Sequence, residues 1–104
     1  MNMREILTIP ITERNQFKGI DSPLLPGGVA HVIRCERDVE LQPDRIYWVY
    51  HAHEDAVVGM LFARATMHQG RIVFVLHGGI IISPDDVVVA GILSSSDHQN
   101  SLNR

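Results

Sequence analysis

The sequence predicts an all-β fold, a compact small domain of about six or seven strands. β-branched and aromatic residues gather in short runs, and some of these alternate with polar residues. Turn-forming residues separate the runs, and only one segment resembles the start of a helix. A chain of 104 residues is long enough to bury one core. We therefore expect a single β domain over residues 1–95 and a flexible polar tail over 96–104.

Four strands are expected in the first two thirds of the chain. Residues 5–11 form a short strand that Pro10 confines to an edge or an end of the sheet. Residues 29–35 alternate between two faces, and the aromatic run 46–53 follows the turn LQPDR. The fourth strand covers residues 56–66.

Three more strands complete the prediction. MHQG is a hairpin signal in which Gly70 suits a positive φ, and residues 71–77 form the returning strand. A brief strand at 80–83 leads into the turn SPDD. Ser83 and Pro84 resemble a helix N-terminus, but the three valines that follow favour a strand over 87–94.

This last predicted strand is apolar on both faces. Simple alternation places Val87, Val89 and Leu93 on one side and Val88, Ala90 and Ile92 on the other. A strand of this kind needs cover on both sides, from a partly closed or folded-over sheet or from a second subunit. Because the sequence offers no helix as cover, a twofold partner is an attractive source, and we expect a homodimer.

Charge and composition exclude several classes of function. Nine basic against twelve acidic residues give a net charge of −3, so we expect no direct nucleic-acid binding. The single cysteine, Cys35, cannot form an internal disulfide, which fits a cytoplasmic protein. No apolar run approaches the length of about 18 residues that a membrane span needs, and no signal peptide is evident. We expect no cofactor.

A series of short motifs runs through the chain in a recognisable order. DSPLLPGG leads into a strand, VELQPDRIYWVY precedes VVGMLFAR and the hairpin to GRIVFVL, and ISPDDVVVAGILSS closes the series. This order resembles the C-terminal serine–lysine peptidase-fold domain of LexA-type and lambda-type repressors and of UmuD. The resemblance covers about residues 17–95. It implies a compact β fold and, in an active member, a serine activated by a neutral lysine.

The resemblance places Ser22 at the nucleophile position, with Pro23 where methionine is usual. The lysine position falls on Gly59, which cannot take a proton from a serine hydroxyl. We therefore expect no catalysis by this dyad. The alternative is a small serine hydrolase or autoprotease in which Lys18 or a histidine activates Ser22. The histidines considered are His31, His51, His53 and His77, with Asp21 or Asp55 as the acid.

The segment HAHED raises the question of a metal site. His51 and His53 are two residues apart on a strand, so their side chains point the same way with Cα atoms roughly 6.5–7 Å apart. His31, Cys35 and His77 lie on strands of compatible parity as further ligands. We favour a solvated polar strand end, because a histidine pair without a spaced third ligand is a weak metal signal.

The preferred hypothesis is a non-catalytic protein-interaction or regulatory domain. It forms a homodimer and binds a repressor, another transcription regulator or a different host protein, with a phage or mobile element as the expected source. The candidate interface residues are Trp48, Tyr50, Val88 and Ile92, because aromatic and branched apolar side chains anchor interfaces. A virion structural protein is an alternative with the same all-β, oligomeric pattern.

Overall fold

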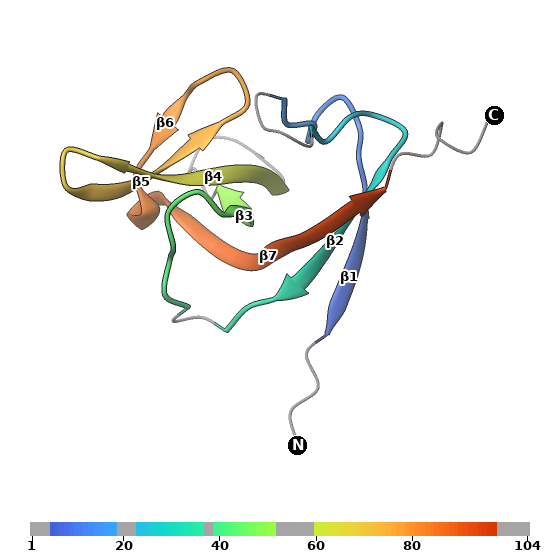
Figure 1. Cartoon of the computed structure of the whole chain (residues 1–104), viewed down its shortest axis with the longest axis horizontal. Helices are drawn as coiled ribbons and strands as arrows, with labels where there is room; N and C mark the ends of the chain where they lie inside the picture. The colour runs from blue at the N-terminus through green and yellow to red at the C-terminus, as the bar shows by residue number, and fades with distance from the viewer. Residues whose placement is uncertain (1–4, 19–22, 37–38, 52–59, 98–104) are drawn as a thin grey trace.

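A computed structural model describes residues 5–18, 23–36, 39–51 and 60–97. In this structure seven strands form one antiparallel sheet, which confirms the predicted all-β fold (Figure 1). The strands are β1 (Ile6–Pro10), β2 (Val29–Arg34), β3 (Ile46–His51), β4 (Met60–His68), β5 (Arg71–Leu76), β6 (Ile81–Ile82) and β7 (Val87–Asp97). Their order across the sheet is β1-β2-β7-β3-β4-β5-β6. The sheet curves strongly but stays open, with β1 and β6 as its edges.

Over the described residues, the predicted strands correspond closely to the observed ones; residues 52–53 and 56–59 of two predicted strands lie outside that part of the chain. β7 continues to Asp97, two residues past the expected domain boundary at residue 95. The segment SPDD forms a single 3-10 turn, η1 (Pro84–Asp86), because the Ser83 hydroxyl accepts a hydrogen bond from the Asp85 N–H at 3.2 Å. The chain returns to an extended conformation at Val87. Within the described part of the chain, no helix has the length and apolar character needed to cross a bilayer.

The last strand in the sequence, β7, lies in the interior of the sheet, between β2 and β3. It carries two β-bulges. Ala90 is an extra residue opposite β3, since Trp48 pairs with Gly91 and Val49 with Val89. Ser94 is an extra residue opposite β2, at the register shift between His31 and Val32.

The bulges correct the prediction that residues 87–94 simply alternate. The extra residue at Ala90 shifts the parity of the side chains that follow it, up to the second bulge at Ser94. As a result, Ile92 packs on the same side as Val87 and Val89, whereas Leu93 packs on the side of Ala90.

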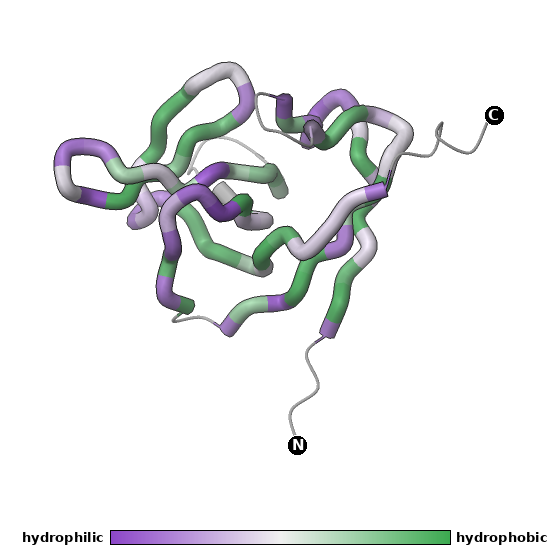
Figure 2. The backbone as a smooth tube through the Cα atoms, viewed as in Figure 1, coloured by the Kyte–Doolittle hydropathy of each residue, from purple (hydrophilic) through white to green (hydrophobic). Residues whose placement is uncertain are grey.

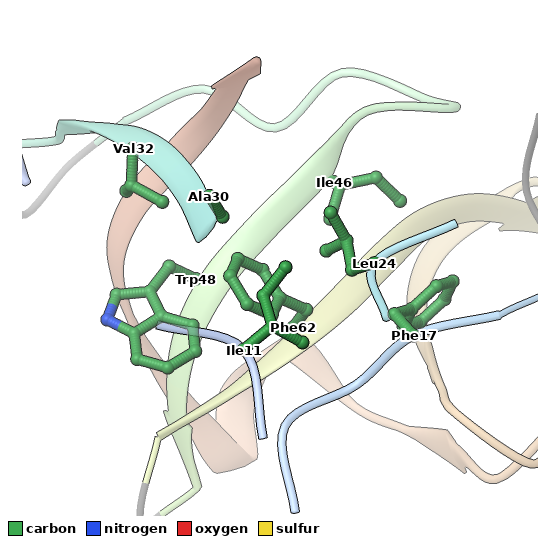
Figure 3. Close-up of a cluster of buried hydrophobic side chains, with 8 residues drawn as sticks. All are labelled: Ile11, Phe17, Leu24, Ala30, Val32, Ile46, Trp48 and Phe62. Carbon is green, nitrogen blue, oxygen red and sulfur yellow. The ribbon is translucent and has the colours of Figure 1, made fainter. Parts of the chain in front are cut away.

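One face of the sheet holds the first core cluster, in which the Trp48 ring packs at a tilt against Phe62, with ring centroids 4.5 Å apart (Figure 3). The segment before β2 covers this face with Ile11, Phe17 and Leu24, all of them buried. Two backbone hydrogen bonds between Phe17 and Leu24, of 2.9 and 2.8 Å, join two parts of this segment to each other. Part of the cover that we attributed to a second subunit therefore comes from the chain itself.

The opposite face holds the second core cluster, centred on Tyr47 and Phe74, whose rings meet edge to face at 5.9 Å. The Tyr47 hydroxyl accepts a hydrogen bond from the Gln42 N–H at 2.9 Å, so the buried phenol keeps a polar partner. Figure 2 shows that hydrophobic stretches follow the strands, whereas hydrophilic residues gather at the turns. Both faces of the sheet therefore contribute to the core.

We expect Gly91→Ala to lower the free energy of unfolding by about 1–3 kcal/mol. A Cβ at this position would meet the Val32 side chain and would lie 2.9 Å from the Ile33 carbonyl oxygen. Urea denaturation measures the loss, and Ser94→Ala, an exposed change in the same strand, should stay within about 0.5 kcal/mol. Adding Val32→Ala should relieve part of the cost, and strictly additive effects would contradict the close approach.

Candidate interaction surface

The residues of the predicted serine site lie outside the described part of the chain. This holds for Ser22 and for Gly59 at the lysine position, as well as for Asp21 and Asp55. Lys18 is described and exposed, and its backbone N–H donates a hydrogen bond to Nδ1 of His77 at 3.3 Å. The missing dyad and the hydrolase alternative both stay predictions.

The candidate metal ligands are distributed over several parts of the sheet. His53 lies outside the described residues, and of His51 only the backbone, at the end of β3, is described. His31 is on β2 and His77 follows β5, and three other strands lie between β2 and β5. Among the described residues, no three histidine, cysteine, aspartate or glutamate side chains form a group able to hold a metal ion.

His31 and Cys35 have other partners in the structure. Nε2 of His31 lies 3.0 Å from the Asp97 carboxylate, which links β2 to the end of β7. The Cys35 thiol donates a weak hydrogen bond to the Ile33 carbonyl at 3.8 Å. His77 packs edge to face against Phe17, with ring centroids 6.5 Å apart.

The four predicted interface residues divide into an internal and an external pair. Trp48 is 7% exposed and belongs to the first core cluster. Ile92 is half-buried against the second. Tyr50 and Val88, by contrast, are 44% and 57% exposed. Alternation in the sequence does not distinguish the internal pair from the external pair. The reason is that the bulge at Ala90 and the burial of Trp48 both arise from tertiary packing.

Tyr50 and Val88 lie directly opposite each other on β3 and β7. On the other side of β3, Tyr50 pairs with the partly buried Met60 at the start of β4. The three residues therefore form one cross-strand row, which we call the Tyr50 surface. Met60 was not among the residues predicted from the sequence, since its place in the row depends on the antiparallel register of β3 and β4.

The neighbours of the Tyr50 surface fix its shape. The residues on either side of Tyr50 in register, Val88 and Met60, sit on strands that make extensive ladders with β3. Val49, next to Tyr50 in sequence, is fully buried in the second core cluster, which anchors the backbone beneath the ring. Two exposed acidic residues, Asp85 and Asp86, precede β7 and give this end of the strand a polar border.

Other large apolar side chains exposed in the described part of the chain are Ile6, Met67, Ile80 and Ile81. Ile6 lies on edge strand β1, Met67 near the β4–β5 turn, and the other two at the opposite edge of the sheet. These residues are exposed because they sit at the edges and ends of the sheet, where no further layer covers them.

Comparison with known proteins gives no relative from which a site could be transferred. No family model matches the chain, and no curated protein matches it. The candidate surface therefore rests on the geometry of the described residues.

Replacing Trp48 and Tyr50 in turn should separate core from surface. We expect Trp48→Ala to lower the free energy of unfolding by about 3–5 kcal/mol, since it removes a buried ring that packs on Phe62. Tyr50→Ala should change it by no more than about 0.5 kcal/mol, because nearly half of that side chain is already in water. Chemical denaturation measures both, and equal losses would contradict the assignment of Tyr50 to the surface.

Proposed function

We propose that this chain is a non-catalytic protein-interaction domain that acts in the cytoplasm as a homodimer. In this proposal, the Tyr50 surface binds a transcription regulator of the repressor type or another host protein, in a phage or mobile-element setting. The single observation that carries the proposal is the exposed cross-strand pair of Tyr50 and Val88.

The chemistry of the Tyr50 surface suits a protein partner. A tyrosine offers a large, rigid apolar area and a hydroxyl, and it loses little conformational entropy on binding because only two side-chain torsions have to be fixed. The strands beneath it are part of the continuous ladder β7-β3-β4, so the surface is already ordered before a partner arrives. The acidic border at Asp85 and Asp86 and the net charge of −3 favour a partner other than nucleic acid.

The non-catalytic part of the proposal is supported by the glycine at position 59. In the LexA-type resemblance this position carries the lysine that activates the serine, and glycine has no side chain to do so. The cytoplasmic part is supported by the use of a single cysteine, which rules out an intrachain disulfide.

We expect Tyr50→Ala to weaken binding of a cognate regulator roughly 30-fold, the effect of an interface hot spot of about 2 kcal/mol. Val88→Ser should weaken it as well, since it places a hydroxyl in the same contact. Co-elution with purified LexA-type repressors identifies the regulator, and isothermal titration measures the affinity.

Met67→Ser is the matched control, because Met67 is a similarly exposed apolar residue outside the Tyr50 surface. It should leave the affinity unchanged. Equal binding by the wild type and the two Tyr50-surface variants would overturn the choice of surface. Failure of every repressor to co-elute with the wild type would overturn the choice of partner.

A further inference from the structure

The first strand of the sheet has one edge that is not paired within the described chain. β1 pairs with β2 alone, at the end of the strand order. Its register with β2 is continuous, and it is flanked by two hydrogen bonds, from the Arg34 N–H to the Glu5 oxygen and from the Ile11 N–H to the Gly28 oxygen, both 2.9 Å. In an antiparallel pair such bonds occur at every second residue. Glu5, Leu7, Ile9 and Ile11 therefore direct their backbone groups towards β2.

It follows that Ile6 and Thr8 direct their N–H and C=O groups away from the sheet. No hydrogen bond within the described chain reaches these four groups. Pro10 also faces outward but has no N–H, and its carbonyl accepts a hydrogen bond from the Asn15 side chain at 3.1 Å. The available edge within the described chain is thus a window of three residues, Ile6 to Thr8, because Pro10, the next outward-facing residue, has no N–H to offer.

We propose that this window binds the β1 strand of a second copy, antiparallel, about a twofold axis at Leu7. In this arrangement Ile6 of one protomer faces Thr8 of its partner, and the reverse holds across the axis. Each of these pairs exchanges two hydrogen bonds, so all four outward groups of each protomer are satisfied. The inference rests on the proposed homodimer and assigns its interface.

The side chains of β1 are compatible with this self-pairing. Leu7, which is partly buried against the first core cluster, meets Leu7 of the partner at the axis. Because leucine is uncharged, no two like charges face each other there. Ile6, which is 63% exposed, gains a β-branched neighbour in Thr8 of the partner. The Glu5 carboxylate is held towards β2 by Arg34, with an oxygen–nitrogen distance of 2.8 Å, and leaves the edge open.

The pairing would also cover the exposed end of an apolar row that crosses the sheet. Ile6 lies opposite Ile33 on β2, which lies opposite Ile92 on β7, which in turn lies opposite Tyr47 on β3. Ile6 is the exposed end of this row. A second copy at β1 would therefore cover the outer end of the row, as an interior strand does.

A second copy fits β1 better than it fits the other edge. β6 consists of two residues. A backbone hydrogen bond from the Leu76 N–H to the Ile80 oxygen shows that the N–H and C=O groups of Ile80 and Ile82 face β5. Only Ile81 then offers its N–H and C=O outward, and Pro84 follows soon after. Self-pairing of Ile81 about a twofold axis would form two hydrogen bonds, against the four that β1 can form through Ile6 and Thr8.

Sedimentation of the wild type and of two Thr8 variants tests the hydrogen bonds. Thr8→Pro removes one outward N–H per protomer, hence two bonds per dimer, without touching the ladder to β2. We expect it to weaken the dimer roughly 10- to 100-fold. Thr8→Val keeps the N–H and the β-branch and should leave the dimer unchanged.

Crosslinking in a Cys35→Ser background tests the register. At the axis, the Cα atoms of the two Leu7 residues would be about 4.5 Å apart, within disulfide range, so Leu7→Cys should form a covalent dimer on mild oxidation. The two Ile6 residues would lie more than about 7 Å apart, so Ile6→Cys should crosslink more slowly although it is more exposed.

A wild type that sediments as a monomer would overturn both the proposed homodimer and this interface. A dimer that is insensitive to Thr8→Pro, or that crosslinks faster through Ile6→Cys than through Leu7→Cys, would overturn the interface alone. Circular dichroism of each variant shows that the fold is retained.

Discussion

The close approach of β7 to β2 at Gly91 is the constraint on which the rest of the structure depends. β7 lies between β2 and β3, and a Cβ at position 91 would collide with the Val32 side chain beneath it. The two bulges in β7 flank this point and increase the local twist of the strand. β7, the last strand in the sequence, can therefore join the pair β1–β2 to the group β3–β6.

The curvature of the sheet explains how so short a chain buries apolar residues on both faces. The segment before β2 contributes Ile11, Phe17 and Leu24 to the first core cluster. The second core cluster includes residues of β5 and β6. Each cluster is built around an aromatic contact, Trp48 with Phe62 and Tyr47 with Phe74. Tyr47 and Trp48 are adjacent on β3 and point to opposite faces, so β3 contributes to both core clusters.

Among the described residues, the exposed large apolar side chains lie near the ends of strands or at the edges of the sheet. The Tyr50 surface lies where β3, β4 and β7 reach one end of their ladders, and Ile6 lies at the β1 edge. The two sites are on different strands, so self-association and binding of another protein need not compete. The proposed function needs two such surfaces, one for a second copy and one for a regulator.

The positions of the strands followed from the sequence because their signals are local. β-branched runs, the Gln69–Gly70 turn and Pro10 at the end of β1 each act within a few residues. The bulge at Ala90 has no such signal, since it depends on how β7 pairs with β3, and it reversed the expected face of Ile92. The burial of Trp48 and the exposure of Tyr50 also depend on tertiary packing, so the sequence alone could not distinguish them.

Native-state hydrogen exchange measures most directly whether β7 and β3 hold the two halves of the sheet together. If they do, the amides of their shared ladder should exchange only by global unfolding, with an opening free energy equal to that from denaturation. The amides of the short edge strand β6 should open at a much lower free energy. Fast exchange along β7 combined with full protection of the β4–β5 hairpin would contradict this account.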